Sequence, residues 1–229
     1  MLEARSTRSR SREKAIVIGG RVWSTRNLEV TTFCNGDRIP QARRDADWRR
    51  AAHEARPAFC YPDNDPVLGR RYGALYNWYA VGDKRGLAPP GWHVATDDEW
   101  EALVVHVGGA GEAGTALKSK RGWKSASAIA GGDLPGCGTD LIGFAALPAG
   151  YRFSGGSFVD RFDDLNRGLF GDWWTATEQR DDVAYHRHMA SMTSAVTRGL
   201  DIKGGGCSVR CVREDDATAS VVKARKPMQ

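Results

Sequence analysis

The C-terminal third of the chain reads GDWWTATE (171–178), AYHRHMASMTSAVTRG (184–199) and CSVRCVRE (207–214). Its apolar and β-branched residues predict short strands at residues 171–177, 183–190, 195–198 and 208–213. The loops between them carry an unusual variety of side chains, and no other part of the sequence offers a better surface for function. We therefore expect this third to close the fold and to hold the functional surface.

Further strands are predicted upstream of this third. A hairpin is expected around Gly19 and Gly20, because two short apolar runs flank this glycine pair. Together with other short apolar runs, it gives predicted strands at residues 15–18, 21–24, 31–33, 57–61 and 144–152.

Helices are predicted from helical spacing and capping signals. Thr96 and Glu99 form a capping box, which marks the start of the best-defined helix in the chain. Trp48 is the expected anchor of a charged surface helix, and Leu75, Tyr76 and Tyr79 fall at helical spacing. The predicted helices cover residues 41–56, 72–81, 97–107 and 112–119. Because strands and helices do not alternate as βαβ units, the expected class is α+β.

Length and charge limit the classes of function. A chain of 229 residues fits one domain, and its net charge of +5 is concentrated towards the ends. We expect residues 1–14 and 215–229 to be solvated, disordered segments. No basic stripe interleaved with aromatic residues lies between them, so nucleic acid is not an expected partner. Neither a membrane span nor a hydrophobic signal core is visible, which predicts a cytoplasmic protein, with export as the alternative if a leader was removed.

The five cysteines do not form a visible disulfide framework. None occurs in a CxxC pattern, and Cys207 and Cys211 would lie about 13 Å apart along a strand, too far to bridge. Reduced, partly buried thiols are expected. A long-range bridge such as Cys60 to Cys211 is the alternative if the protein is exported.

Metal ligands are sparse. His186 and His188 stand two apart on one face of a predicted strand, a spacing found in transition-metal sites, but no third ligand is identifiable. Asp63 and Asp65 lie in the turn sequence PDNDP without the other oxygen ligands that calcium needs. We therefore predict no metal and no cofactor.

Several long motifs occur in one order along the chain. They are VWSTRNLEVTTFCNGDRIP (22–40), YGALYNWYAV (72–81), GLAPPGWHVATDDEWEAL (86–103), GFAALPAGYR (143–152), DWWTATE (172–178) and SVRCVRE (208–214). In this set the chain resembles the Fibrobacter succinogenes major paralogous domain family, over residues 15–214.

The resemblance implies a fold and a range of roles. That family is related to the formylglycine-generating enzyme domain, which implies a C-type lectin-like fold, with two helices flanking small antiparallel sheets and long loops. Members are usually found in exported or surface proteins. Similar domains are the variable ligand-binding proteins of diversity-generating retroelements, in which the segment between a WWS-like strand and the final RCVR-like strand is diversified.

Catalysis is not expected. Formylglycine-generating enzymes use a pair of cysteines before the closing strand, whereas residues 178–206 contain no cysteine and Cys211 matches the closing strand itself. A lone thiol cannot replace a two-thiolate copper site. The acidic pairs at 163–164 and 181–182 are adjacent in sequence and so point apart, which does not suit a general acid–base pair.

The segment 178–206 is instead interpreted as a recognition surface. Met189 and Val196 are expected core anchors, and either Trp173 or Trp174 is the candidate floor of the surface. Mixed donors, acceptors and aromatics suit adaptable recognition. The candidate ligand-binding residues are Trp174, Arg180, Asp182, Tyr185, His186, His188, Ser191, Thr193, Thr197 and Asp201.

The resulting hypothesis is a non-enzymatic protein that binds a protein or another macromolecular ligand, as a diversity-generating retroelement variable protein. If adenine rewriting diversifies its codons, Glu178, Gln179, Met189, Met192 and Lys203 would be fixed positions or would be encoded differently. Sugar binding does not follow, because the Glu-Pro-Asn triplet of calcium-dependent lectins is absent. The alternatives are a structural or adhesion module of a surface protein and, last, a divergent oxidase.

Overall fold

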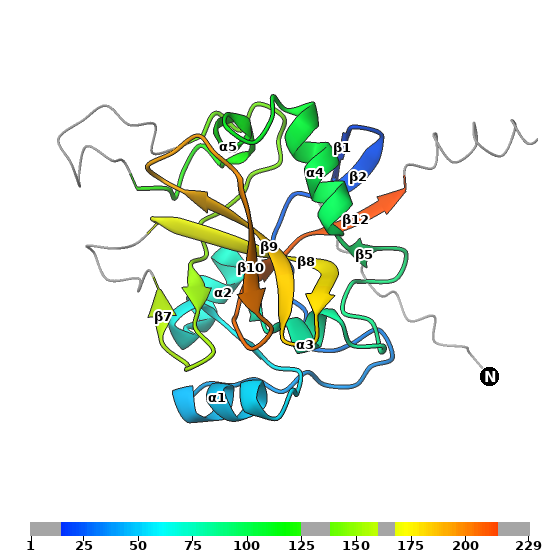
Figure 1. Ribbon diagram of the computed structural model, residues 1–229, viewed down its shortest axis with the longest axis vertical. Coiled ribbons are helices and arrows are strands. Elements are labelled where there is room, and N and C mark those ends of the chain that lie inside the picture. Colours follow the sequence, from blue (N-terminus) through cyan, green and yellow to red (C-terminus); the bar gives the residue numbers. More distant parts are fainter. Residues whose placement is uncertain (1–14, 125–137, 160–167, 215–229) are drawn as a thin grey trace, which may run out of the picture.

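A computed structural model describes residues 15–124, 138–159 and 168–214, and its fold is built on two four-stranded sheets (Figure 1). The predictions of disorder at 1–14 and 215–229, and the acidic pair at 163–164, lie outside these residues. The described part is a mixture of short helices and small sheets, so the α+β class is confirmed.

The first sheet joins the two ends of the described chain. Its strand order is β1-β2-β12-β5, and all of its neighbouring strands are antiparallel. The predicted hairpin is confirmed, because Ile16 pairs with Trp23 across the Gly19–Gly20 turn. The strands are β1 (Ala15–Ile18), β2 (Arg21–Ser24), β5 (His93–Val94) and β12 (Cys211–Glu214).

The second sheet, called the central sheet here, has the order β10-β9-β8-β11. Its first three strands are antiparallel, and the short β11 pairs parallel with β8. Two small ribbons flank the two main sheets: β3 with β4 and β6 with β7. The bounds are β3 (Phe59–Cys60), β4 (Leu75–Tyr76), β6 (Tyr151–Arg152), β7 (Phe158–Val159), β8 (Phe170–Arg180), β9 (Val183–Ala190), β10 (Thr197–Ile202) and β11 (Ser208–Val209).

Five α-helices occur among the described residues, more than the two expected from the resemblance. They are α1 (Asp45–His53), α2 (Pro66–Tyr72), α3 (Trp78–Val81), α4 (Asp97–His106) and α5 (Ala113–Leu117), with a 3₁₀ turn η1 at Pro62–Asn64. Figure 1 shows α4 and α5 at one end of the molecule and α1 at the other. In the described residues, no helix combines the length and the apolar character needed to cross a membrane.

The central sheet separates two hydrophobic clusters, and two adjacent tryptophans belong to opposite clusters. Trp173 packs with Trp100 of α4, and its Nε1 donates to Asn27 Oδ1 at 2.9 Å. Trp174 packs with Tyr76 on the other face, and its Nε1 donates to the Tyr76 carbonyl at 2.9 Å. Both side chains are fully buried, because successive residues of a strand face opposite sides and both sides are covered here.

The capping box predicted at the start of α4 is confirmed. Thr96 Oγ1 accepts from the Glu99 amide at 3.2 Å, and Glu99 Oε2 accepts from the Thr96 amide at 2.8 Å. Two otherwise unpaired amides of the first turn are thereby satisfied. Trp100, Leu103 and Val104 of this helix are buried in the core.

The single helix predicted for residues 72–81 is wrong. Helix α2 ends at Tyr72, Leu75 and Tyr76 form β4, and α3 starts only after Asn77. Gly73 has φ +84, and a side chain there would collide with Asn27. The Asn77 side chain accepts from the Ala80 amide at 3.1 Å and so begins a new helix. The apolar spacing reflects burial on two sides rather than one helical face.

Three predicted strands also differ from the structure. Residues 31–33 form only an isolated bridge, between Thr32 and Arg38. Residues 144–152 form a strand only at β6, with isolated bridges at Ala146 and Gly150, because the φ of Ala145 is +52 and the nearby carbonyls accept from buried side chains. The strand predicted at 208–213 is divided at Arg210, where the chain passes from the central sheet into the first sheet.

Arg210 is a buried cation that holds this crossover. Its guanidinium donates to Asn27 Oδ1 at 2.8 Å and to the carbonyls of Ser24, Phe144 and Ala145 at 2.6–2.9 Å. Burial lowers the pKa of Arg210 to about 9, so the group remains charged at neutral pH. One side chain therefore connects β2, the loop before β6 and the junction of the two sheets.

We expect Arg210→Met to lower the free energy of unfolding by at least about 3 kcal/mol, because it leaves several buried carbonyls without donors. Urea denaturation followed by tryptophan fluorescence measures this change. Arg213→Met, three positions on and partly exposed over Trp92, should cost about 1 kcal/mol or less. Equal losses in the two variants would contradict the role assigned to Arg210.

Candidate functional site

One face of the central sheet, called the histidine face here, gathers polar side chains from three strands. Asp172 of β8 pairs with His188 of β9, and Thr197 of β10 pairs with the same residue from the other side. Directly paired residues share a face, so these side chains project together. His186 lies two residues from His188 and therefore on the same face, as its spacing predicted.

A cavity of about 310 Å³ opens on the histidine face, between the central sheet and the β6–β7 ribbon. Charged and aromatic groups form its walls, and Phe153 and Ile202 at its rim are nearly half exposed, at 49% and 45%. Binding pockets typically combine apolar walls with a few placed polar groups. The lining residues are Tyr151, Phe153, Val159, Phe170, Asp172, His186, His188, Asp201 and Ile202.

The buried carboxylate of Asp172 lies between two imidazoles. His188 Nδ1 hydrogen-bonds Asp172 Oδ1 at 2.9 Å, whereas His186 Nδ1 approaches the same oxygen at 3.3 Å without hydrogen-bond geometry. Burial alone would raise the pKa of Asp172, but the two imidazoles outweigh it and lower that pKa. Burial would likewise lower the pKa of His188, but the hydrogen bond and charge of Asp172 raise it above 6.5.

The position of His186 is fixed by its neighbours. Gly199 lies opposite His186 on β10, and any side chain there would overlap the imidazole. The ring of Trp174 lies 6.2 Å from that of His186, centroid to centroid, in an edge-on arrangement. Trp174 thus supports the pocket from the core without reaching its surface.

Tyr151 and Asp201 form the second polar pair of the cavity. The Tyr151 hydroxyl hydrogen-bonds the Asp201 carboxylate, and a side chain at Gly205 would overlap that hydroxyl. Burial and the neighbouring negative charge raise the pKa of Tyr151, so the phenol keeps its proton. Asp201 Oδ1 also accepts from the Ile202 amide at 2.7 Å. The two groups that donate to Asp201, the Tyr151 hydroxyl and the Ile202 amide, are both uncharged.

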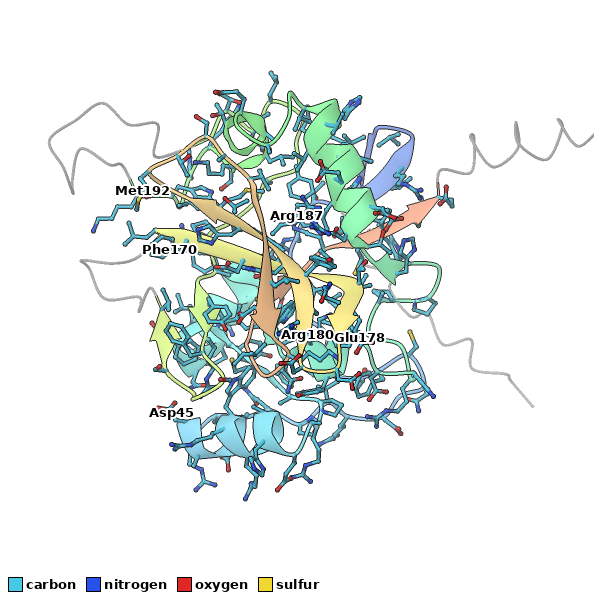
Figure 2. All side chains as sticks on the ribbon, viewed as in Figure 1. Asp45, Phe170, Glu178, Arg180, Arg187 and Met192 are labelled. Atoms are coloured by element: carbon cyan, nitrogen blue, oxygen red, sulfur yellow. The ribbon has the colours of Figure 1, made fainter. Side chains whose placement is uncertain are left out.

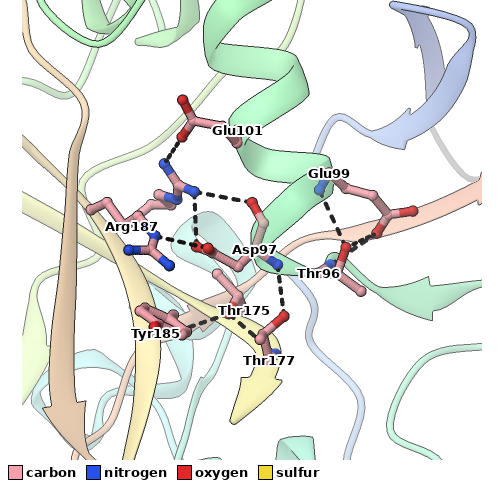
Figure 3. A network of polar contacts seen from close by, with 9 residues as sticks. Thr96, Asp97, Glu99, Glu101, Thr175, Thr177, Tyr185 and Arg187 are labelled. Atoms are coloured by element: carbon pink, nitrogen blue, oxygen red, sulfur yellow. Dashed lines mark hydrogen bonds and ion pairs between the residues drawn. The ribbon is translucent and has the colours of Figure 1, made fainter. Parts of the chain in front are cut away.

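The opposite face of the central sheet carries a different polar network (Figure 3). Arg187 donates to Asp97 Oδ1 at 2.8 Å and to Glu101 Oε2 at 2.9 Å, while Arg198 donates to Asp97 Oδ2 at 2.8 Å. The Arg198 guanidinium also lies 3.9 Å from the centre of the Tyr185 ring. These contacts attach β9 and β10 to α4, so we interpret this network as scaffold.

The predicted site residues therefore divide into groups. His186, His188 and Asp201 line the cavity, and the exposed Thr197 lies beside it on β10. Arg180 and Asp182 pair with each other at 2.8 Å on the exposed β8–β9 hairpin, away from Phe170 at the start of β8 (Figure 2).

Three of the predicted ligand-binding residues do not reach the cavity, and a fourth is held partly by the scaffold. Trp174 and Ser191 are fully buried and cannot contact a ligand. Tyr185 belongs to the face that packs on α4, because the strand alternates. Thr193 is half-buried, and its carbonyl accepts from the Lys118 ammonium at 2.7 Å, so this backbone position is held by the scaffold.

Six residues that line the cavity were not among the predicted site residues: Tyr151, Phe153, Val159, Phe170, Asp172 and Ile202. The alternation of the DWWTATE strand could have placed Asp172 on the same side as Trp174. Nothing in the sequence brings Tyr151 and Phe153 to this sheet, since only the tertiary structure places the β6–β7 ribbon, to which they belong, beside it.

No site for a metal is assembled in the described residues. Across residues 15–124, 138–159 and 168–214, no group of three or more His, Cys, Asp or Glu side chains could hold a metal ion. Cys34, Cys60, Cys207 and Cys211 are free thiols, so the alternative bridge between Cys60 and Cys211 is not formed, and Cys137 lies outside the described residues.

We expect Asp172→Asn to lower the pKa of His188 from above 6.5 in the wild type to below 6.5. The carboxylate charge raises this pKa against the effect of burial, and an amide would leave the effect of burial unopposed. Titration of the histidine side chains by NMR measures both values. The NMR signals of the exposed His106 should be the same in both proteins, and an unchanged pKa of His188 would rule out the assigned pairing.

Comparison with known proteins gives one match. The model of the Fibrobacter succinogenes major domain family matches residues 16–213. No curated protein and no solved structure matches the chain. The matched range contains the motifs on which the resemblance was based, apart from Glu214 at the end of the last one, and the family prediction is confirmed. With nearly all of its described residues inside that match, the chain belongs to the Fibrobacter succinogenes major domain family.

Proposed function

We propose that this protein is a non-enzymatic binding domain that recognises a macromolecular partner through residues 178–206 and the cavity of the histidine face. The observation that carries this proposal is the cavity itself. It combines a buried Asp172 that is paired with His188, an exposed apolar rim and residues of three adjacent strands. Sites built on strands hold their side chains in fixed positions, which favours selective binding.

The arrangement of cysteines supports binding rather than oxidase chemistry. Cys207 and Cys211 are both buried, and burial raises the pKa of Cys207 well above its ordinary value, with a further contribution from Asp172 and Asp201. A protonated, enclosed thiol is a poor copper ligand and a poor nucleophile. The free thiols are also typical of a reducing compartment, so we propose a cytoplasmic location, with export as the alternative.

We also propose a C-type lectin-like fold for the described chain. The supporting observation is that β1, β2 and β12 bring the two ends of the domain together in one sheet, while long connections lead to and from the central sheet. The recognition segment then lies between the strand that contains the paired tryptophans and the closing strand β12.

Diversification of this segment is part of the proposal. Among the positions that adenine rewriting leaves unchanged, Met189 is buried in the core, and Lys203 binds Glu178 and the Asp181 carbonyl beneath the surface. Among the rewritable positions, His186, His188 and Asp201 line the cavity. Rewriting would thus change residues of the pocket and leave Met189 and Lys203 unchanged. Ser191 is an exception, because it is rewritable and buried.

The genomic locus tests the diversification step. We expect a reverse-transcriptase gene and a near-identical template repeat of the region encoding residues 178–206, with mismatches confined to template adenines. Sequencing the locus in the source organism provides the measurement. A locus with neither element would contradict diversification and leave the binding proposal standing.

Recognition itself is tested by selecting random peptides displayed on phage against the full chain. We expect binding clones to lose at least about tenfold in affinity for a His186→Ala, His188→Ala double variant, because two of the polar groups that line the pocket are gone. Arg180→Ala should weaken clones that also contact the hairpin.

His106→Ala is the matched control, since it removes an exposed histidine from α4 on the other side of the central sheet. Thermal unfolding checks that the variants fold. The proposal fails if no clone is enriched, or if the enriched clones are as sensitive to the control as to the double variant.

A further inference from the structure

The cavity of the histidine face has an unbalanced charge. Asp172 has His188 and His186 as counter-groups, at 2.9 and 3.3 Å. Asp201 has only the Tyr151 hydroxyl and the Ile202 amide, and within the described residues no cationic side chain forms an ion pair with it. A half-buried carboxylate without a counter-charge attracts a cation.

Aromatic groups stand around this carboxylate. The rings of Tyr151 and Phe153 meet edge to face with centroids 5.2 Å apart, and the Phe170 ring lies 5.6 Å from that of His188. Phe153 leaves about half of its surface exposed at the rim. The faces of aromatic rings attract ammonium and guanidinium groups, most strongly where water is partly excluded.

An anionic ligand does not suit the same cavity. His188 is the histidine of the cavity with a raised pKa, and its Nδ1 already hydrogen-bonds Asp172. An incoming anion would face both Asp172 and Asp201, and the described residues that line the cavity include no lysine or arginine to pair with it. The surrounding Val159 and Ile202 offer contacts for an aliphatic stem rather than for a second charge.

We propose that this cavity receives the basic side chain of a protein partner, a lysine or an arginine, with its cationic group on Asp201 and its stem along the aromatic rim. This inference rests on the proposed binding function and adds the chemical class of the group that is recognised. The ammonium or guanidinium replaces the missing counter-charge of Asp201, while Tyr151 holds the carboxylate in place.

The test uses the full chain and four small probes: the N-acetyl methylamides of lysine, arginine, leucine and glutamate. The NMR signals of His186 and His188 report occupancy of the cavity. We expect saturable shifts with the lysine and arginine probes, and at least about tenfold weaker binding of the leucine and glutamate probes. Basic peptides carrying the same side chain should bind more tightly than the isolated probes.

Two variants and one control locate the cation. Asp201→Asn keeps an acceptor for Tyr151 but removes the charge, and it should weaken the basic probes about tenfold. Phe153→Leu keeps an apolar rim but removes a ring, and it should weaken them about threefold. Asp181→Asn removes an exposed carboxylate of the same segment outside the cavity, and it should change nothing.

The outcomes separate this inference from the proposed function. Preferential binding of the leucine or glutamate probe in the cavity would overturn the basic-ligand inference and leave recognition at this site intact. Basic probes that bind equally to the wild type and to Asp201→Asn would also overturn it. If no probe shifts the two histidines, the inference fails, and the peptide selection decides the binding function independently.

Discussion

The arrangement of the two sheets depends on the hydrogen bonds of the buried Arg210 guanidinium. Arg210 is the single residue between β11 and β12, where the chain leaves the central sheet and enters the first sheet. Its bonds to Asn27 and to the Ser24 carbonyl attach this crossover to the N-terminal hairpin. An unpaired charge or carbonyl in the interior costs free energy, so these segments are held in the relative position in which the Arg210 guanidinium makes all of these hydrogen bonds.

Two more buried arginines extend the same principle. Arg152 is enclosed between the rings of Trp48 and Phe158, and it donates to the Ala42 carbonyl at 2.8 Å. Arg187 attaches β9 to α4 on one face of the central sheet. With that face occupied by scaffold, the cavity lies on the other face, around His186. The location of the candidate site is therefore consistent with the interactions made on the opposite side of the sheet.

Local patterns predicted the elements that depend on short-range contacts. The Gly19–Gly20 hairpin, the Thr96 capping box and β9 all form as expected, since each is specified by neighbouring residues. Residues 72–81 were mispredicted because Leu75 and Tyr76 are buried by distant strands, which produces apolar spacing without a helix. The site was anticipated in part: alternation placed His186 and His188 together, but not their pairing with Asp172.

By itself, the sequence determined the family, the α+β class, the position of the best helix and the face that the two histidines share. These follow from motif order, capping chemistry and the two-residue period of a strand. Only the tertiary structure decided that Trp174 is core, that Tyr185 faces α4, and that Tyr151 and Asp201 meet across the cavity. The reason is physical: burial and charge pairing depend on which distant segments cover a strand, and a local pattern of residues does not specify those segments.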